Sequence, residues 1–238
     1  MLIYGRNPVL EALREGQVSR LWVARGVEAW LLRELKQMGA EYELMPRIEL
    51  DQMVRTTAHQ GLVAEVEEAQ YSSLEAPFAF AKSRNEQPLL VVLDGVTDPR
   101  NYGAIIRSAF ALGAHGVLTE ERRSAPLSAL VVKASAGTAN KLPLVQVKNL
   151  SRTLEALKER GLWIYGTSGK ADQDLTHLDY QRPLAIVIGS EGEGMRRLVG
   201  EHCDELARIP LAEGAESLNA AVALGIVLYQ AGLGRKKL

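Results

Sequence analysis

Short apolar runs alternate with amphipathic stretches along most of this sequence. In the first part, apolar residues recur at helical spacing after Asn7 and across 27–39, and extended apolar runs fall at 20–24, 42–45 and 61–66. Asn7 is followed by Pro8, a pair typical of a helix start with asparagine as the N-cap. This pattern predicts a small α/β domain over residues 1–68.

The pattern weakens between residues 69 and 87, where Ser, Pro, Glu and Gln interrupt any period, and this composition favours a linker with one short helix. From Leu89 onward, short and strongly apolar strands alternate with helical stretches. We expect these strands at 89–93, 116–119, 142–147, 162–165, 184–188 and 206–209. The alternation predicts a second α/β domain over 88–238, with a mainly parallel sheet covered on both faces.

Ligands of such sheets bind beyond the carboxyl ends of the strands, which here places Asp94, Thr167, Gly189 and Leu211 near a site. The stretch 209–225 combines a strand exit, a polar loop and an apolar helix. We expect Ser217 to be the N-cap of a helix that runs to about Gln230. Asn219 would then lie in the first turn, where free backbone N–H groups suit a ligand. A simple cap beside a solvated asparagine is the competing interpretation.

A glycine-rich loop, GSEGEGM, follows the apolar strand LAIVI at 184–188. A glycine turn before a helix can bind pyrophosphate. The spacing is not G-x-G-x-x-G, however, and Glu191 and Glu193 would oppose a polyanion. A neutral or cationic ligand fits better, and the sulfonium of S-adenosylmethionine is a natural candidate. A tight turn with solvated glutamates is the alternative.

The segment DPRNYGAIIRSA, beginning at Asp98, predicts a turn followed by a helix from about Asn101. Arg107 would lie within two turns of the helix start, and long helical side chains lean toward the N-terminus. The arginine could therefore reach a site at that end. Spacing alone favours the competing interpretation, an arginine on the surface of an amphipathic helix.

The 238 residues carry a formal charge of -1, so bulk charge does not indicate nucleic acid. The single cysteine, Cys203, excludes an internal disulfide, and the four histidines have no metal-ligand spacing. No apolar run reaches the ~18 residues that a membrane span needs. We expect a cytoplasmic protein without a metal site or a membrane role.

Three motifs together resemble the TrmH-type branch of the SPOUT superfamily, which contains RNA 2′-O-ribose methyltransferases. They are DGVTDPRNYGAIIRSA, LAIVIGSEGEGM and IPLAEGAESLN, in the family's order. The N-terminal segments YGRNPVLEAL, SRLWVARG and HQGLVAEV are similar to the RNA-binding domain of the bacterial 23S rRNA guanosine methyltransferases of this branch. The sequence departs from the third motif where Glu213 takes the usual place of a glycine and Gly214 follows, and where Ala220 replaces a more usual valine.

This resemblance implies a small RNA substrate-binding domain, a catalytic domain with a deep C-terminal trefoil knot, and a homodimer. It also implies S-adenosylmethionine as cofactor, and 23S rRNA or, alternatively, tRNA as substrate. The implied cofactor-binding residues are Thr167, Gly189, Ile209, Leu211, Ser217 and Leu218. The implied catalytic positions are Asn101, Arg107, Glu191, Ser217 and Asn219. Candidate phosphate contacts in the first domain are Arg6, Arg20, Arg25 and Arg55.

Two hypotheses for Arg107 stay open, because a guanidinium with a pKa above ~12 is a poor base. Either an unusual site deprotonates Arg107, or the arginine stabilises the developing alkoxide while another group takes the proton. Glu191 is the available carboxylate, and its expected role is to orient Arg107 or Asn101. The competing functional classes are an NAD-dependent oxidoreductase, which lacks its glycine motif here, and a non-catalytic RNA-binding protein, which would not need the polar motif residues.

Overall fold

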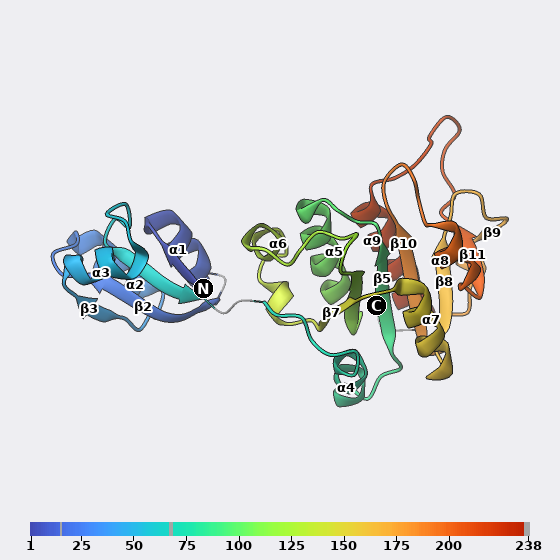
Figure 1. The fold of residues 1–238 in the computed structure, drawn as a ribbon, viewed down its shortest axis with the longest axis horizontal. Helices are drawn as coiled ribbons and strands as arrows, with labels where there is room; N and C mark the ends of the chain where they lie inside the picture. Colours follow the sequence, from blue (N-terminus) through green and yellow to red (C-terminus); the bar gives the residue numbers. More distant parts are fainter. Residues whose placement is uncertain (15, 67–68, 236–238) are drawn as a thin grey trace. The chain divides into compact units, whose positions relative to one another are not determined.

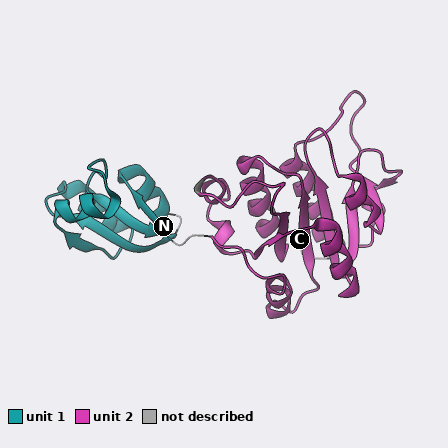
Figure 2. Cartoon of the chain, viewed as in Figure 1, with its two compact units in different colours: residues 1–68 teal, residues 69–238 magenta. Residues whose placement is uncertain are grey.

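The computed structural model describes residues 1–14, 16–66 and 69–235. The chain divides into two compact units, Met1–Glu68 and Ala69–Leu238 (Figure 2). Each unit has its own sheet and its own hydrophobic core, so each is described separately.

The first unit is a four-stranded mixed sheet covered by three helices. Its strand order is β1-β4-β2-β3, in which only β2 and β3 run parallel. Successive residues of β2 face opposite sides, so Leu21 and Val23 pack on α1 and α2, while Trp22 packs on α3 with Leu50. The elements are β1 (Leu2–Tyr4), α1 (Arg6–Arg14), β2 (Val18–Ala24), α2 (Ala29–Gln37), β3 (Glu43–Met45), α3 (Arg47–Val54) and β4 (Leu62–Val66).

Two local expectations for this unit were wrong. Asn7 is not the N-cap of α1, because the helix begins at Arg6 and its first backbone hydrogen bond runs from Val9 N–H to the carbonyl of Gly5. Helix α3 was missed, since Leu50 is its only buried residue and one apolar contact produces no detectable period.

The second unit is built on a seven-stranded sheet in which every described pairing is parallel, in the order β7-β6-β5-β10-β8-β11-β9. This confirms the expected parallel sheet. The strands are β5 (Leu89–Asp94), β6 (Gly116–Glu120), β7 (Leu144–Val147), β8 (Trp163–Thr167), β9 (Gln173–Asp174), β10 (Leu184–Gly189) and β11 (Glu205–Arg208). The helices are α4 (Ala76–Ser83), α5 (Pro99–Ala111), α6 (Ala129–Ala134), α7 (Leu150–Glu159), α8 (Arg197–Glu201) and α9 (Ala220–Gly234), and two short 3-10 turns lie at Thr138–Asn140 and Leu175–His177.

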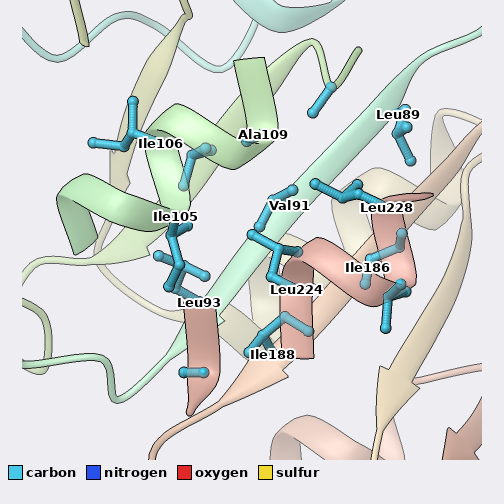
Figure 3. Close-up of a cluster of buried hydrophobic side chains, with 14 of the residues drawn as sticks. Leu89, Val91, Leu93, Ile105, Ile106, Ala109, Ile186, Ile188, Leu224 and Leu228 are labelled. Atoms are coloured by element: carbon cyan, nitrogen blue, oxygen red, sulfur yellow. The ribbon is translucent and has the colours of Figure 1, made fainter. Parts of the chain in front are cut away.

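Helices cover both faces of this sheet (Figure 1). Leu89, Val91 and Leu93 of β5 point toward α5 and α9, where they pack beside Ile105 and Leu224 (Figure 3). The intervening residues of β5 face α7 and α8. All six residues of β5 are buried, which explains why the strand reads as one continuous apolar run before Asp94.

The segment 69–87 is not a free linker, although the expected short helix is present as α4. Ser72 donates its N–H to the carbonyl of Leu144 at 2.6 Å and forms a parallel bridge with Val145 beside β7. Phe78 and Phe80 of α4 pack against the two cores of the second unit. The segment therefore belongs to the second unit.

The trefoil knot stays a prediction from the resemblance. Among the helices of the described residues, none combines the length and the apolar character that crossing a bilayer requires.

Candidate functional site

Three loops meet at the carboxyl edge of the central strands. Gly189, at the end of β10, lies opposite Asp94, at the end of the parallel neighbour β5. The loops after β5, β10 and β11 carry the three sequence motifs, and the parallel register brings them to the same edge. The sheet topology thus assembles motifs that are far apart in the sequence.

Asn101, Glu191 and Asn219 form one hydrogen-bonded network at this edge. Asn101 donates its side-chain N–H to Glu191 Oε1 at 3.1 Å, and Asn219 donates to Asn101 Oδ1 at 2.9 Å. Asn219 also donates to Glu191 Oε1, which in addition accepts the backbone N–H of Ala220 at 3.2 Å. One carboxylate oxygen therefore ties together the first turn of α5, the N-terminus of α9 and the glycine loop.

Asn219, and not Ser217, is the N-cap of α9. Its Oδ1 accepts the backbone N–H groups of Ala221 at 2.9 Å and Val222 at 3.3 Å. Both residue types cap helices well, so the sequence could not separate them. The consequence is that Asn219 caps the helix with its oxygen and donates to the network with its nitrogen.

A pocket beside this network brings together all six residues expected to bind the cofactor. The loops after β8, β10 and β11 supply its walls, and the first turns of α9 close it. Sequence reasoning missed several lining residues because they carry no distinctive side-chain chemistry. The lining comprises Thr167, Ser168, Gly169, Ile188, Gly189, Ser190, Gly194, Ile209, Leu211, Glu216, Ser217, Leu218, Ala220 and Ala223.

The composition of this pocket fits a neutral or cationic ligand. Its lining contains one charged side chain, Glu216, and no lysine or arginine. Apolar side chains such as Ile209 and Leu218 offer packing for a flat ring, while loop backbone offers hydrogen bonds. The donor set suits the adenine and sulfonium groups of S-adenosylmethionine and opposes the pyrophosphate of NAD.

The glycine loop is closed by its own backbone. Ser190 and Gly194 exchange hydrogen bonds of 3.0 and 3.1 Å, and Gly192 and Gly194 adopt φ values of +86° and +72° that favour glycine. A Cβ on Gly189 would lie 2.2 Å from the carbonyl carbon of Gly194. Gly189 is therefore required by the returning chain of the loop.

Sequence reasoning also missed an ion-pair cluster that anchors the far end of this loop. The carboxylate of Asp94, which is fully buried, accepts the backbone N–H of Arg196 at 2.7 Å and its Nε at 2.6 Å. Arg196 also reaches Glu120 at the end of β6, at 2.8 Å. The loop is thus fixed at Gly189 by sheet register and at Arg196 by charge.

Arg107 does not join the network. Helix α5 begins at Pro99 with Asp98 as N-cap, so it starts earlier than expected and Arg107 lies in its third turn. The side chain is exposed and has no hydrogen-bond or ion-pair partner within the described parts of the chain. Of the two expected roles for Glu191, the structure therefore shows the contact with Asn101 and not one with Arg107.

The loop before α9 accommodates the departure from the third motif. Ala215 donates its N–H to the carbonyl of Ala212 at 3.1 Å, and Gly214 adopts a φ of +84° within this turn. Glycine at 214 instead of 213 therefore supplies the left-handed residue that the turn needs.

Comparisons with known proteins agree with this architecture. Residues 88–229 match the SpoU rRNA methylase family, and residues 2–72 match the substrate-binding domain of RNA 2′-O ribose methyltransferases. A TrmH-family tRNA/rRNA methyltransferase of Bacillus subtilis is 43% identical, over 96% of this chain and 93% of its own length. The 23S rRNA (guanosine-2′-O-)-methyltransferase RlmB of Pseudomonas aeruginosa is 42% identical, over 96% and 94%.

Solved structures extend the likeness to the fold. The SpoU methyltransferase AviRb from Streptomyces viridochromogenes, in complex with its cofactor AdoMet, has a TM-score of 0.70 and 29% identity, covering 100% of this chain and 91% of that one. Both family matches agree with the Asn101–Glu191–Asn219 network and with a pocket that is lined by no lysine or arginine. The chain belongs to the SpoU family, also called TrmH, of S-adenosylmethionine-dependent RNA 2′-O-methyltransferases.

Proposed function

We propose that this enzyme methylates the ribose 2′-hydroxyl of a guanosine in 23S rRNA. The observation that supports the reaction is the Asn101–Glu191–Asn219 network beside a pocket lined by the six residues expected to bind the cofactor. Support for the substrate comes from relatives of near full-length coverage that are named as 23S rRNA guanosine methyltransferases. A tRNA substrate is the second candidate, since another relative is named for both RNA classes.

Methylation of defined RNAs tests this proposal. Unmodified 23S rRNA and tRNA transcripts are incubated with the protein and labelled S-adenosylmethionine, and the modified nucleotide is mapped. We expect label on a guanosine 2′-oxygen of 23S rRNA. Label on tRNA alone would favour tRNA as the substrate. Absence of label on both RNAs would overturn the proposed methylation.

The pocket residues hold the cofactor in this proposal, and the cofactor supplies an electrophilic methyl group. Thr167, Gly189, Ile209, Leu211, Ser217 and Leu218 surround it. Glu216, the charged side chain of the lining, is placed to favour a cation. The network adjoins the pocket through Ala220, a lining residue whose backbone N–H donates to Glu191, and through Asn219, which donates to Asn101.

For the chemistry, the network residues position groups and Arg107 supplies charge. Glu191 holds both asparagine side chains, so the first turn of α5 is fixed relative to the pocket. Arg107 projects from the same helix without a competing partner among the described residues, which leaves its guanidinium able to bind the RNA phosphate or the developing 2′-alkoxide. An always-charged arginine stabilises that oxygen more readily than it accepts the proton.

The enzyme acts as a homodimer in this proposal, with α9 at the interface. Four apolar side chains form one exposed stripe along the helix at spacings of four, three and four residues: Val222, Ile226, Tyr229 and Leu233, which are 51%, 38%, 54% and 44% exposed. Such a stripe on a helix whose other side is already buried favours a partner surface. Light scattering should give twice the 26.1 kDa chain mass. Ile226→Arg should give the monomer mass, and a wild-type monomer would overturn the dimer.

The first unit selects the RNA in this proposal. Arg20 stacks on Trp22, and Arg6 stacks on the half-exposed ring of Trp30, although Arg6 also pairs with Glu28. Arg25 and Arg55 are further phosphate candidates. Because the segment 69–87 packs on the second unit, the appropriate truncation begins at Ala69. That variant should keep S-adenosylmethionine affinity and lose RNA methylation, and full RNA activity would contradict this division of roles.

A further inference from the structure

The arginines of the second unit fall into two groups. In one group each side chain has a partner: a carboxylate, an aromatic ring or backbone carbonyls. These are Arg84, Arg160, Arg182, Arg196, Arg197, Arg208 and Arg235. In the other group no side-chain partner is found among the described residues. These are Arg100, Arg107, Arg122, Arg123 and Arg152.

Four of the five members of the second group lie in one region of the fold. Apart from Arg107, its members lie at the carboxyl edge of β5, β6 and β7: Arg100 in the first turn of α5, Arg122 and Arg123 after β6, and Arg152 in the first turn of α7. Lys148, also exposed and without a partner in the described chain, lies between β7 and α7. We call Arg100, Arg122, Arg123, Lys148 and Arg152 the arginine surface.

Backbone hydrogen bonds join the loops that carry this surface. Glu121 donates its N–H to Val147 at 2.9 Å, which places the loop after β6 against the loop after β7. On the other side, Ala125 donates its N–H to Val96 at 2.9 Å, next to the start of α5. The loops that carry the arginine surface therefore adjoin one another in the order β5, β6, β7, beginning beside the helix that carries Asn101 and Arg107.

Local stability does not explain these cations. Arg100 and Arg152 lie in the first turns of helices, where the macrodipole and free N–H groups favour negative charge, and neither first turn contains an acidic residue. Exposed arginines at these positions are slightly unfavourable for the helices that carry them, and a bound anion would offset this effect.

The opposite half of the same edge has the reverse charge. The loops after β8, β10 and β11 expose Asp172, Glu191, Glu193, Glu213 and Glu216, against Lys170 and the half-buried Arg196, which pairs with Asp94. On the loops that carry the arginine surface, the exposed acids are Asp98, which caps α5, and Glu121. A polyanion entering the site is thus attracted from the β6 and β7 side and repelled from the β8 and β11 side.

We infer, on the basis of the proposed RNA methylation, that the RNA strand flanking the target ribose runs over the loops after β6 and β7, with its phosphates on the arginine surface. Arginine suits this role because its planar fork binds phosphate oxygens in pairs. The contacts are to phosphates, so they position the strand without reading its sequence. Arg107 lies on the same helix as Arg100, about two turns further along, and is the other α5 arginine without a partner among the described residues.

A pair of matched double variants tests the path. Arg122→Gln with Arg123→Gln removes two charges from the arginine surface, and neither side chain has a folding contact to lose in the described structure. The control, Arg84→Gln with Arg160→Gln, removes the same charge at the amino edge of the sheet. Binding to an unmodified 23S rRNA transcript is measured across a salt series, together with S-adenosylmethionine affinity and thermal unfolding.

We expect the surface variant to bind this RNA roughly 30-fold more weakly at about 0.1 M salt, with the slope of log K against log salt reduced by about 1.5, because two phosphate contacts are lost. Its affinity for S-adenosylmethionine and its thermal unfolding should equal those of the wild type, and the control variant should keep the wild-type RNA slope.

Equal RNA affinity and slope in the surface and control variants would overturn the path and leave the arginine surface as a contact for an acidic protein. That result leaves the proposed function intact as long as the wild type methylates RNA. A wild-type protein that binds S-adenosylmethionine but neither binds nor methylates the 23S rRNA or tRNA transcripts would instead overturn the proposed function, and the path with it.

Discussion

Replacing Asn219 by aspartate separates the two contacts that this side chain makes. Its oxygen caps α9 through the N–H groups of Ala221 and Val222, and its nitrogen donates to Asn101 and Glu191. Asn219→Asp keeps an oxygen for the cap and replaces the donating nitrogen by a charged oxygen that faces Glu191. The helix should therefore stay capped while the network loses its central donor.

The structure allows the size of this effect to be estimated. A lost hydrogen bond to a neutral amide costs about 0.5–1.5 kcal/mol, and one to a carboxylate about 1.5–3 kcal/mol. Two carboxylates about 4 Å apart add repulsion of about 1 kcal/mol in water-like surroundings. Glu191 and Asn219 are exposed, so the low end of each range applies. The total is about 3 kcal/mol, or a loss of roughly 100-fold in kcat/KM if the network must stay formed in the transition state.

Methyl transfer and thermal unfolding together test this reasoning, with Asn219→Ala as the control. The alanine variant loses the cap as well, worth about 1 kcal/mol, and its Tm should fall by about 2–4 °C. The aspartate variant keeps the cap, so the part of the Tm fall that is due to the cap should be absent while its activity is lost. Its activity relative to wild type should also recover as the pH is lowered, because the introduced carboxyl can donate a hydrogen bond once it is protonated.

Wild-type kcat/KM in the aspartate variant at neutral pH would refute the role assigned to the network. A loss of activity that is accompanied by the same fall in Tm as in alanine, and is independent of pH, would show that only the helix cap matters.

Substitutions at three further positions have defined outcomes. Arg107→Ala should abolish methyl transfer and leave the affinity for S-adenosylmethionine unchanged. Arg107→Lys should retain about 1% of the activity if only the positive charge is needed, and no activity if the planar guanidinium or a base is required. Arg235→Lys should lower the Tm, measured by calorimetry, by roughly 6–10 °C. The guanidinium donates to four backbone carbonyls just before β5 and β10, and an ammonium would leave some of them unpaired. An unchanged Tm would contradict this. Gly189→Ala should abolish S-adenosylmethionine binding in a titration while the fold persists, because its Cβ must displace the loop backbone; wild-type affinity would show that the loop tolerates the shift.

The sequence was most informative where burial was complete. The strand β5 is buried on both faces, so its apolar run appears directly in the sequence and was placed to within a residue. The parallel sheet followed from the alternation of such runs with helices. In contrast, α3 buries a single side chain, and β9 is only two residues long, so neither leaves a periodic signal. Their positions depend on tertiary contacts that no local pattern encodes.

The sequence predicted which residues form the site, but not which hydrogen bonds join them. The resemblance supplied Asn101, Glu191 and Asn219, but which donor meets which acceptor depends on the register of β5 against β10 and on where α9 begins. Ser217 and Asn219 are both good caps, and only the completed network distinguishes them, because the nitrogen of an asparagine can donate while its oxygen caps.

Asp94 explains how exposed residues can keep a fixed arrangement. Its backbone lies in register with Gly189, where the glycine loop begins, and its buried carboxylate binds Arg196, where the loop ends. Removing Arg196 would leave the buried Asp94 carboxylate without its cation, so this ion pair holds the far end of the loop while sheet pairing holds Gly189. Glu191 lies between these two anchors and can therefore stay exposed to the RNA while holding Asn101 and Asn219 in place. The carboxylate that anchors the loop is thus buried beneath the site, whereas the arginines proposed to meet the RNA, Arg107 and those of the arginine surface, have no partner among the described residues.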